Sequence, residues 1–272
     1  MQDNILEIKN LSKYFGGLAA VSNCSLRVKQ GTITGIIGPN GSGKTTLFNL
    51  IAGNLKSSAG SVLFNNENIT DIPSYELFSK GLLRTFQIAH DFTNLSVLEN
   101  LMMVPGNQSG EKLMNALLKP GLVAKEESQI KEKAMEVVAF LNLTHLKNEL
   151  AGNLSGGQKK LLELGRTMMV DAKLVLLDEV GAGVNRTLLK DLGTAIEKLN
   201  KEKGYTFCMI EHDMDFIGRL CDPVIVMAEG SVLFEGSVED AKKDEKVIEC
   251  FVKAQISCKR GKSNKRKSNG SS

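Results

Sequence analysis

Residues 38–45 read Gly38-Pro39-Asn40-Gly41-Ser42-Gly43-Lys44-Thr45. The run fits the pattern GxxxxGK[ST] and follows a short apolar stretch, 32–37, whose composition is typical of a buried strand. A helix is expected to begin at Lys44 and to end near Ala52. Strand, glycine-rich turn and helix, in this order, are the context in which the pattern indicates a phosphate-binding loop. A plain glycine-rich turn is the alternative, and the flanking elements disfavour it.

The residue types in this run suit the phosphates of a nucleotide. Glycines permit positive φ and let backbone N–H groups converge on phosphate oxygens, and the following helix directs its positive end at the same oxygens. The Lys44 ammonium reaches the β- and γ-phosphates, while the Thr45 hydroxyl is able to ligate Mg²⁺. ATP and Mg²⁺ are therefore the expected ligands. The expected nucleotide-binding residues of the loop are Gly38, Asn40, Gly41, Ser42, Gly43, Lys44, Thr45 and Thr46.

The composition is that of a globular protein. The chain has 272 residues, enough for one large domain or two small ones, and 42% of them are hydrophobic. No run approaches the roughly 18 apolar residues that a membrane span needs, and the first residues lack the basic region of a signal peptide. The five scattered cysteines form no CxxC pair, which favours reduced thiols over a disulfide framework or a zinc site.

The net charge of +3 is divided unevenly along the chain. Residues 259–272 carry six basic residues and no acidic one, so the remainder holds 28 basic residues against 31 acidic ones. The charge of the body therefore gives no indication of nucleic-acid binding. The tail is rich in Lys, Ser, Asn and Gly, which predicts a solvated, disordered end. A tether to anionic lipid and a contact with nucleic acid are the alternatives for it.

The remaining pattern indicates an α/β core interrupted by a helical insertion. Strands are expected at 5–8, 61–64, 174–177, 207–210, 224–227 and 232–234, and helices at 186–201 and 238–254. Between about 74 and 170 the pattern is helical, and the apolar residues of 127–141 fall at helical spacing, which favours core packing. The expected division is one domain at 1–258, with the insertion at roughly 88–165, and the tail at 259–272.

Three further groups of residues gain meaning beside the phosphate loop. Residues 154–158, Leu-Ser-Gly-Gly-Gln, precede a helical pattern, and alone they would read as an ordinary Ser N-cap in a glycine-rich loop. Asp178 and Glu179 end the strand 174–177, so one carboxylate is able to hold Mg²⁺ while its neighbour orients the attacking water. A solvated turn is the alternative for this pair. His212 follows the strand 207–210, at the edge where α/β sheets collect ligands.

Together these motifs resemble an ABC transporter ATP-binding subunit, over roughly residues 4–254. The order is the same: an aromatic residue, the phosphate loop (Walker A), a glutamine, the signature motif at 154–158, the acidic pair (Walker B) and a histidine. The resemblance implies a P-loop NTPase fold, an ABC cassette with a RecA-like α/β core, an antiparallel β subdomain and a helical subdomain insertion. It also implies an ATPase whose hydrolysis is coupled to transport.

The resemblance assigns a role to each matched residue. Phe15 matches the aromatic residue that stacks on adenine, with Tyr14 a weaker candidate. Gln87 matches the residue that links Mg²⁺ and water to the membrane subunit. The expected catalytic residues are Glu179 as the base, His212 as the γ-phosphate sensor, and Gln87. The expected metal ligands are Thr45, Gln87 and Asp178. The residues expected to close over the ATP of a partner are Ser155, Gly156, Gly157 and Gln158.

Longer matches indicate one branch of the family. Five stretches resemble the larger ATP-binding subunit of branched-chain amino-acid importers: 15–21, 45–51, 84–87, 95–100 and 211–214. This implies uptake of branched-chain or other small amino acids. The implied partners are a second ATP-binding subunit, in a heterodimer or in isolation a homodimer, two transmembrane permeases and, indirectly, a solute-binding protein. The implied location is peripheral, at the cytoplasmic face of the inner membrane.

Other members of the family are the alternatives. Uptake of urea or short amides belongs to the same branch, and lipopolysaccharide export is a near relative. A non-transport ABC protein that acts on nucleic acid is disfavoured, because translation-type members carry two cassettes and chromosome-type members insert long coiled coils. Neither occurs in this sequence. No nucleic-acid partner is therefore expected.

Two local features stay open at this level. Val180 stands where the family usually has proline after the catalytic glutamate, which leaves the geometry of the following D-loop, 180–185, undetermined. The insertion after Gln87 is expected to dock on the membrane subunits. Within it, Phe92, Leu95 and Leu98 either line the docking groove or belong to the buried core.

Overall fold

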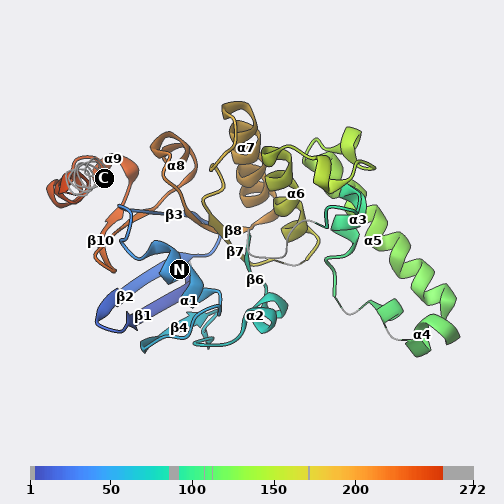
Figure 1. Ribbon diagram of the computed structural model, residues 1–272, viewed down its shortest axis with the longest axis horizontal. Helices are drawn as coiled ribbons and strands as arrows, with labels where there is room; N and C mark the ends of the chain where they lie inside the picture. The colour runs from blue at the N-terminus through green and yellow to red at the C-terminus, as the bar shows by residue number, and fades with distance from the viewer. Residues whose placement is uncertain (1–3, 86–91, 107, 112, 171, 254–272) are drawn as a thin grey trace, which may run out of the picture. The chain divides into compact units, whose positions relative to one another are not determined.

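The structure is a computed structural model that describes residues 4–85, 92–106, 108–111, 113–170 and 172–253. The chain divides into two compact units, the first formed by 1–80 with 206–272 and the second by 81–205. Both contain strands and helices, so the expected α/β class is confirmed (Figure 1). The insertion expected at 88–165 falls within the second unit, which extends beyond it at both ends. Gln87 and the tail at 259–272 lie outside the described residues.

The first unit contains a four-stranded antiparallel sheet in the order β2-β1-β4-β5. Its strands are β1 (Asn4–Phe15), β2 (Leu18–Lys29), β4 (Ala59–Phe64) and β5 (Glu67–Asn68). The strand expected at 5–8 is therefore much longer, and β2 was missed altogether. The pairing of β1 with β2 shifts register between Ile8 and Leu11, where Asn10 has a φ of 49°. Asparagine tolerates this left-handed conformation, so the hairpin continues through the irregularity.

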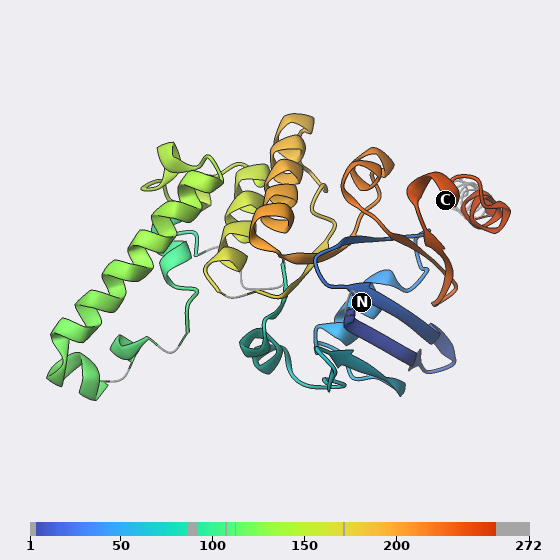
Figure 2. The same cartoon turned by 180° about the vertical axis from the view of Figure 1, so that it is seen from behind.

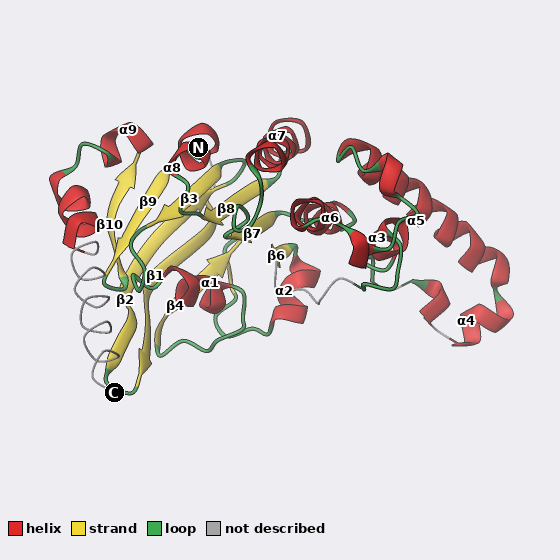
Figure 3. Ribbon diagram, turned by 45° about the horizontal axis from the view of Figure 1, so that its top comes forward, coloured by secondary structure: helices red, strands yellow, loops and turns green. Residues whose placement is uncertain are grey.

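A second set of strands in this unit runs in the order β10-β9-β3-β8 (Figure 3). The strands are β3 (Ile33–Ile37), β8 (Thr206–Ile210), β9 (Val224–Ala228) and β10 (Ser231–Gly236). β3 pairs in parallel with both β8 and β9, and every residue of β3 and of β8 is buried. Because β3 and β8 are parallel neighbours, the loops that follow them emerge at the same edge.

The described part of this unit also contains helices. They are α1 (Lys44–Ile51), α2 (Ser74–Lys80), α8 (Met214–Leu220), α9 (Val238–Ala241) and a helix at 245–253. The single helix predicted at 238–254 is wrong, because residues 242–244 break it. Asp244 accepts a hydrogen bond from the Val247 backbone N–H at 3.0 Å and so caps a new helix. That cap restarts the chain in a second helical segment.

The second unit has two parallel strands, β6 (Leu82–Arg84) and β7 (Leu174–Asp178). β6 interrupts the helical stretch that the sequence pattern predicted between 74 and 170. The helices are α3 (Val97–Met102), α4 (Leu113–Leu118), α5 (Pro120–Phe140), α6 (Gly156–Met168) and α7 (Arg186–Lys203). Short 3-10 turns lie at Ser109–Glu111, Thr144–Leu146 and Ala151–Asn153. α5 is the longest helix in Figure 2, and its Ala134, Val137 and Val138 are buried, as the helical spacing predicted.

A buried polar pair connects α6 to α3. The Arg166 guanidinium donates to the Asn100 side-chain oxygen, and both residues are buried. The Asn100 amide also donates to the backbone carbonyls of Phe92, Leu95 and Ser96, at 3.1, 3.2 and 3.0 Å. Buried polar groups of this kind are stable only when they are hydrogen-bonded. The pair therefore fixes the loop 92–96 onto the same framework as α6.

The start of α6 packs against the start of α7. Gly157 is buried, and a Cβ built on it would lie 2.5 Å from Leu188 Cδ1 and 2.9 Å from Leu188 Cβ. A Cβ on Gly156 would approach nothing nearer than the Gly183 carbonyl oxygen, at 3.8 Å. Asn185 caps α7 by accepting from the Leu188 backbone N–H at 2.9 Å, which fixes where Leu188 lies. The absence of a side chain at 157 is thus a packing requirement within the chain.

The described cysteines are free thiols, and three of them, Cys24, Cys208 and Cys221, are buried. Burial raises the pKa of the Cys24 thiol to about 11 and that of the Cys208 thiol to about 12. Such thiols are inert packing residues. None of the helices in the described ranges combines the length and the hydrophobicity that a membrane-spanning segment requires.

We predict that Gly157→Ala destabilises the protein by about 1–2 kcal/mol, because the new methyl group overpacks against Leu188 and helix propensity offsets only part of that cost. Gly156→Ala is the matched control and should change the stability by less than about 0.5 kcal/mol. Thermal and urea unfolding of the two variants beside the wild type measure the difference. Equal stability of the two variants would contradict the packing role of Gly157.

Candidate functional site

The glycine-rich loop lies between β3 and α1, as its pattern predicts. Gly43 is the N-cap of α1 and has a φ of 97°, a conformation that glycine adopts without strain. A Cβ at this position would lie 2.4 Å from the Ala20 carbonyl oxygen of β2. No side chain caps α1. The helix therefore begins at a residue that has no side chain to cap it, and a helix N-terminus that faces a glycine-rich loop is the arrangement that binds phosphate.

Lys44 is buried at the start of α1, with 6% of its surface exposed. Its Nζ donates to the Gly38 carbonyl at 2.9 Å, the Pro39 carbonyl at 3.0 Å and the Ser42 hydroxyl at 3.3 Å. The loop thus supplies polar partners that stabilise the buried ammonium. Thr45, the next residue, is exposed, and Thr46 is half-buried. Thr45 is thus an exposed residue at the start of the helix, where the sequence pattern expects a Mg²⁺ ligand.

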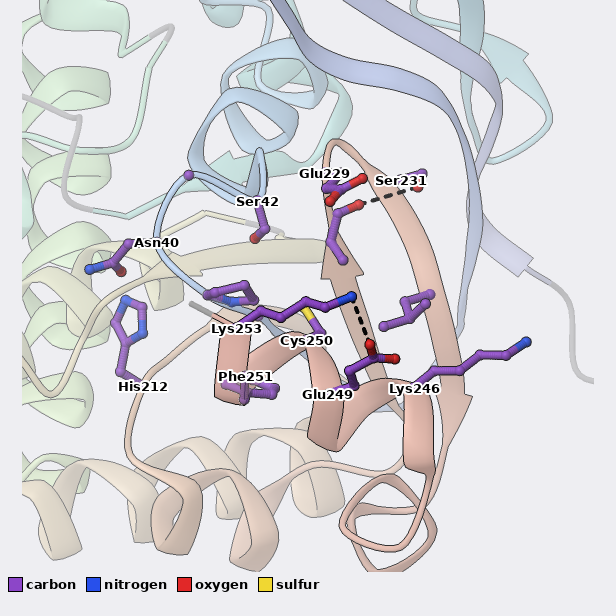
Figure 4. A pocket seen from close by; sticks show the side chains of 15 residues that line it. Asn40, Ser42, His212, Glu229, Ser231, Lys246, Glu249, Cys250, Phe251 and Lys253 are labelled. Carbon is purple, nitrogen blue, oxygen red and sulfur yellow. Dashed lines mark hydrogen bonds and ion pairs between the residues drawn. The ribbon is translucent and has the colours of Figure 1, made fainter. Parts of the chain in front are cut away.

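An open pocket of about 940 Å³ lies beside this loop (Figure 4). Asn40 and His212 lie near each other along its wall, which agrees with the shared edge of β3 and β8. The pocket is lined by the loop residues Gly38 to Ser42, by His212, by Ala228, Glu229, Ser231 and Leu233 of the β9–β10 hairpin, and by Lys246, Glu249, Cys250, Phe251 and Lys253. The structure therefore brings His212 to the phosphate loop, as its position after a core strand led us to expect.

The helix at 245–253 is a part of this pocket that the sequence did not indicate. Lys253 Nζ and Glu249 Oε1 form an ion pair at 2.7 Å on its exposed side. The hydrogen bond from Lys253 lowers the pKa of the Glu249 carboxyl. Sequence motifs describe the loop and the histidine, but no motif marks a helix that lies beside them only in the folded chain.

His212 is exposed and is positioned by residues on either side of it. Glu211 is buried, and its carboxylate accepts from the His212 backbone N–H at 3.2 Å. Asp213 caps α8 by accepting from the N–H groups of Asp215 and Phe216, each at 3.0 Å. A buried residue before the histidine and a helix cap after it fix the chain direction at this point.

Phe15 and Tyr14 end β1, and both rings are about half exposed, at 49% and 50%. The Lys13 ammonium lies 5.2 Å from the centre of the Phe15 ring, which is within the range of a cation–π contact. The next two residues, Gly16 and Gly17, would carry a Cβ into open space. Phe15 therefore has room for a flat ligand beside it. Because Phe15 and Tyr14 are equally exposed, exposure alone does not decide which of them would stack on adenine.

In the second unit, β7 ends at the acidic pair. Arg84 of β6 donates from Nη2 to Asp178 Oδ2 at 2.6 Å, and only 5% and 15% of the two side chains are exposed. A charge-assisted bond of this length in a largely buried setting orients the carboxylate. No role was predicted for Arg84 beyond its place in the motif of Gln87. A charged residue directly after the buried Leu82 and Leu83 was the available signal.

Glu179 follows with an exposed side chain and a φ of 50°, which is uncommon for a residue with a Cβ. Its carbonyl oxygen accepts from the Ala182 N–H at 3.2 Å and from Lys160 Nζ at 3.1 Å. Val180 is buried, with 1% of its surface exposed. Together with the bond from Val184 N–H to the Gly181 carbonyl at 3.2 Å, these contacts define the turns of the segment 180–185 that the sequence left undetermined.

Ser155 caps α6, as expected. Its hydroxyl accepts from the Gln158 N–H at 3.4 Å, while the Gln158 side-chain oxygen accepts from the Ser155 N–H at 2.9 Å. This reciprocal capping box fixes the signature loop. It also shows that the Gln158 side chain contributes to the helix cap. Ser155 and Gly156 are exposed, and Gly157 is buried beneath them against Leu188.

The three apolar residues Phe92, Leu95 and Leu98 are not fully buried. Phe92 is 47% exposed, and Leu95 and Leu98 are half-buried. Their loop is held from behind by the Asn100 amide. The buried-core alternative is therefore wrong for these three residues, and the lining of a docking groove stays a prediction. Gln87 itself lies outside the described residues.

Comparisons with known proteins identify the relatives of this chain. Residues 21–182 match the family model described as ABC transporter. The probable branched-chain amino acid transport ATP-binding protein LivG of Archaeoglobus fulgidus is 43% identical over 253 residues, which cover 93% of this chain and 97% of the relative.

Solved structures agree with this match. A nucleotide-free ATP-binding cassette from an ABC transporter is 40% identical, covers 92% of this chain and 99% of its own, and superposes with a TM-score of 0.78. A dimeric cassette in a post-hydrolysis state, bound to ADP and Pi, is 25% identical with a TM-score of 0.69, over 86% of this chain and 98% of its own. With the phosphate loop, the acidic pair and the capped signature helix all in place, the chain belongs to the ABC transporter family as an ATP-hydrolysing ATP-binding subunit.

Proposed function

We propose that this chain couples ATP binding and hydrolysis to the uptake of branched-chain or other small amino acids through two membrane permeases. The observation that carries the proposal is the start of α1, where Gly43 caps the helix without a side chain and the loop holds the Lys44 ammonium. The name of the 43% identical relative supports the class of solute. The subunit would act at the cytoplasmic face of the membrane, attached through its permeases.

ATP binding would replace some of the hydrogen bonds that Lys44 makes within the loop. The Lys44 ammonium now donates to three oxygens of the loop, within 3.3 Å. Oxygens of the β- and γ-phosphates would take over part of this coordination, and the helix end would stabilise their charge. Further backbone and side-chain donors to the phosphates would come from Gly38, Asn40, Gly41, Ser42, Gly43 and Thr46. Phe15 would stack on the adenine, and its open flank at Gly16 and Gly17 supports that placement.

Mg²⁺ would be held by the Thr45 hydroxyl, Asp178 and Gln87 together with the phosphates. The donor set consists of oxygens only, which fits a hard cation. Arg84 engages Asp178 Oδ2, and Oδ1 is the oxygen that we assign to the ion. Bound Mg²⁺ would neutralise charge on the β- and γ-phosphates. Orienting Asp178 for this task is the role that we give to Arg84.

Hydrolysis would depend on Glu179 and His212. The Glu179 carboxylate would accept a proton from the attacking water and orient that water in line with the bond to be broken. The exposed His212 side chain would contact the γ-phosphate, and Glu211 and Asp213 hold its backbone for that purpose. Gln87 would report the state of the site to the permease side.

The signature loop would serve the nucleotide of a second ATP-binding subunit. The exposed Ser155 and Gly156, at the N-terminus of α6, would approach the γ-phosphate held by that partner. A related cassette forms a dimer bound to ADP and Pi, which supports the pairing of two ATP-binding subunits. The pair would be a heterodimer with a shorter related ATPase, or a homodimer in isolation. The exposed Phe92 and its loop would contact a permease.

We predict that Lys44→Ala weakens ATP binding by at least about 100-fold, because a buried, charge-assisted contact to the phosphates is lost. Titration calorimetry with ATP and Mg²⁺ measures the change. Lys56→Ala, at an exposed lysine outside the loop, is the control and should bind as the wild type does. Micromolar binding retained by Lys44→Ala would argue against the assignment of the loop.

We predict that Glu179→Gln lowers the rate of ATP hydrolysis by about 100-fold or more and leaves ATP bound in a dimer, because the amide cannot take the proton from water. Phosphate release and gel filtration in the presence of ATP measure the two effects. Glu202→Gln, at an exposed residue of α7, is the matched control. Wild-type hydrolysis by Glu179→Gln, assembled with its partners, would show that the base lies elsewhere.

The solute class is tested in cells from which the gene has been removed. We expect the wild-type chain to restore uptake of radiolabelled leucine, and the Glu179→Gln chain to fail, because transport requires turnover. Radiolabelled urea and acetamide serve as comparison solutes in the same cells. Restored uptake of urea or acetamide with no effect on leucine would transfer the assignment to the amide class.

A further inference from the structure

Lys160 lies in the second turn of α6, the helix that begins at the signature loop. Its ammonium donates to the backbone carbonyl oxygen of Glu179 at 3.1 Å. The two residues belong to segments 19 positions apart in the sequence, and Lys160 is half-buried where they meet. The contact therefore connects the signature helix to the residue that we assign as the base, within a single chain.

The backbone of Glu179 needs such support. Its φ of 50° lies in the left-handed region, which is unfavourable for a residue with a Cβ relative to the ordinary conformations. The following residue is Val180, which has no ring to restrict its own φ. Strained conformations persist only where the surroundings determine them.

Three contacts hold the peptide group in place. The Lys160 ammonium and the Ala182 N–H both donate to the Glu179 carbonyl oxygen. The Val180 side chain is buried and anchors the other side of the peptide bond. Of the two donors, Lys160 carries a full charge, and hydrogen bonds from charged donors are roughly twice as strong as those between neutral groups. Lys160 reaches this oxygen from another secondary-structure element, the helix α6.

We propose that Lys160 is a positioning residue for catalysis: it holds the Glu179 peptide in its left-handed conformation and thereby fixes the direction of the Glu179 side chain. The proposal rests on the assignment of Glu179 as the base. It also gives the signature helix a second task. The same helix that presents Ser155 to a partner's nucleotide would position the carboxylate that acts on the chain's own nucleotide, so movement at one site would reach the other.

The test compares Lys160→Met and Lys160→Arg in the full-length chain. Met keeps the length of the side chain without a donor, and we expect kcat for ATP hydrolysis to fall by about 10- to 100-fold, because displacement of a catalytic group by about 1 Å costs up to about 100-fold. KM for ATP should change by less than about threefold. Arg is able to donate to the same carbonyl oxygen and should restore kcat to within about threefold of the wild type. Lys173→Met, an equal charge change at an exposed lysine of the same unit, should be unaffected.

A second arm separates this role from an effect of Lys160 on the partner's nucleotide. Glu179→Gln is expected to form an ATP-bound dimer, and the Lys160→Met/Glu179→Gln double variant should form the same dimer, because the signature loop is intact. Loss of the dimer in the double variant would overturn the proposal and place Lys160 at the partner's site. Wild-type kcat in Lys160→Met, or failure of Arg to restore it, would also overturn the proposal.

The same measurements distinguish the two levels of inference. If Glu179→Gln hydrolyses ATP at the wild-type rate, the assignment of the base is wrong and the role of Lys160 fails with it. If Glu179→Gln is inactive while Lys160→Met is fully active, the base stands and only the positioning role fails. Melting temperatures of all variants check folding. Because Lys160 is only half-buried, they should agree with the wild type.

Discussion

The Lys44 ammonium, buried inside its own loop, is the interaction on which the phosphate site depends. A buried charge is stable only with polar partners, and here the carbonyls of Gly38 and Pro39 and the Ser42 hydroxyl provide them. The loop can take this path because residue 43 is a glycine: its φ is 97°, and a Cβ there would lie 2.4 Å from the Ala20 carbonyl oxygen of β2. A backbone contact with β2 of the antiparallel sheet thus restricts the path of the loop, and the N-terminus of α1 forms the other side of the phosphate site.

A comparable set of constraints unites the signature and catalytic segments of the second unit. Gly157 allows α6 to rest on Leu188, Ser155 and Gln158 cap the helix reciprocally, and Lys160 reaches the Glu179 carbonyl. Arg84 orients Asp178 beside them. Each contact is local, yet together they make the signature loop and the acidic pair parts of one packed body. With the roles proposed for Ser155 and Glu179, chemistry at one nucleotide and contact with another would be mechanically related through these contacts.

Much of the fold could be predicted because its signals are local. The apolar strands 33–37 and 174–177, the helix after Lys44 and the Ser155 cap follow from periodicity, glycine and capping chemistry. Two features that the sequence prediction lacked, strand β2 and the break at 242–244, also have local physical causes. The strand β2 alternates buried Cys24, Leu26 and Val28 with polar neighbours, a signal that was present and was overlooked. The break at 242–244 carries a cap, Asp244, within a segment of otherwise helical composition.

By itself, the sequence determined the chemistry that depends on residue type and short spacing: a glycine loop before a helix, a lysine and threonine at its start, an acidic pair after a strand and a capped signature helix. Only the tertiary structure decided which distant groups support them. Four such contacts join residues that are far apart in the chain. They are the packing of Leu188 against Gly157, the hydrogen bond from Lys160 to Glu179, the ion pair of Arg84 with Asp178, and the position of the helix 245–253 beside Asn40 and His212. Such contacts depend on how whole elements pack, and packing geometry is not encoded in the spacing of any one motif.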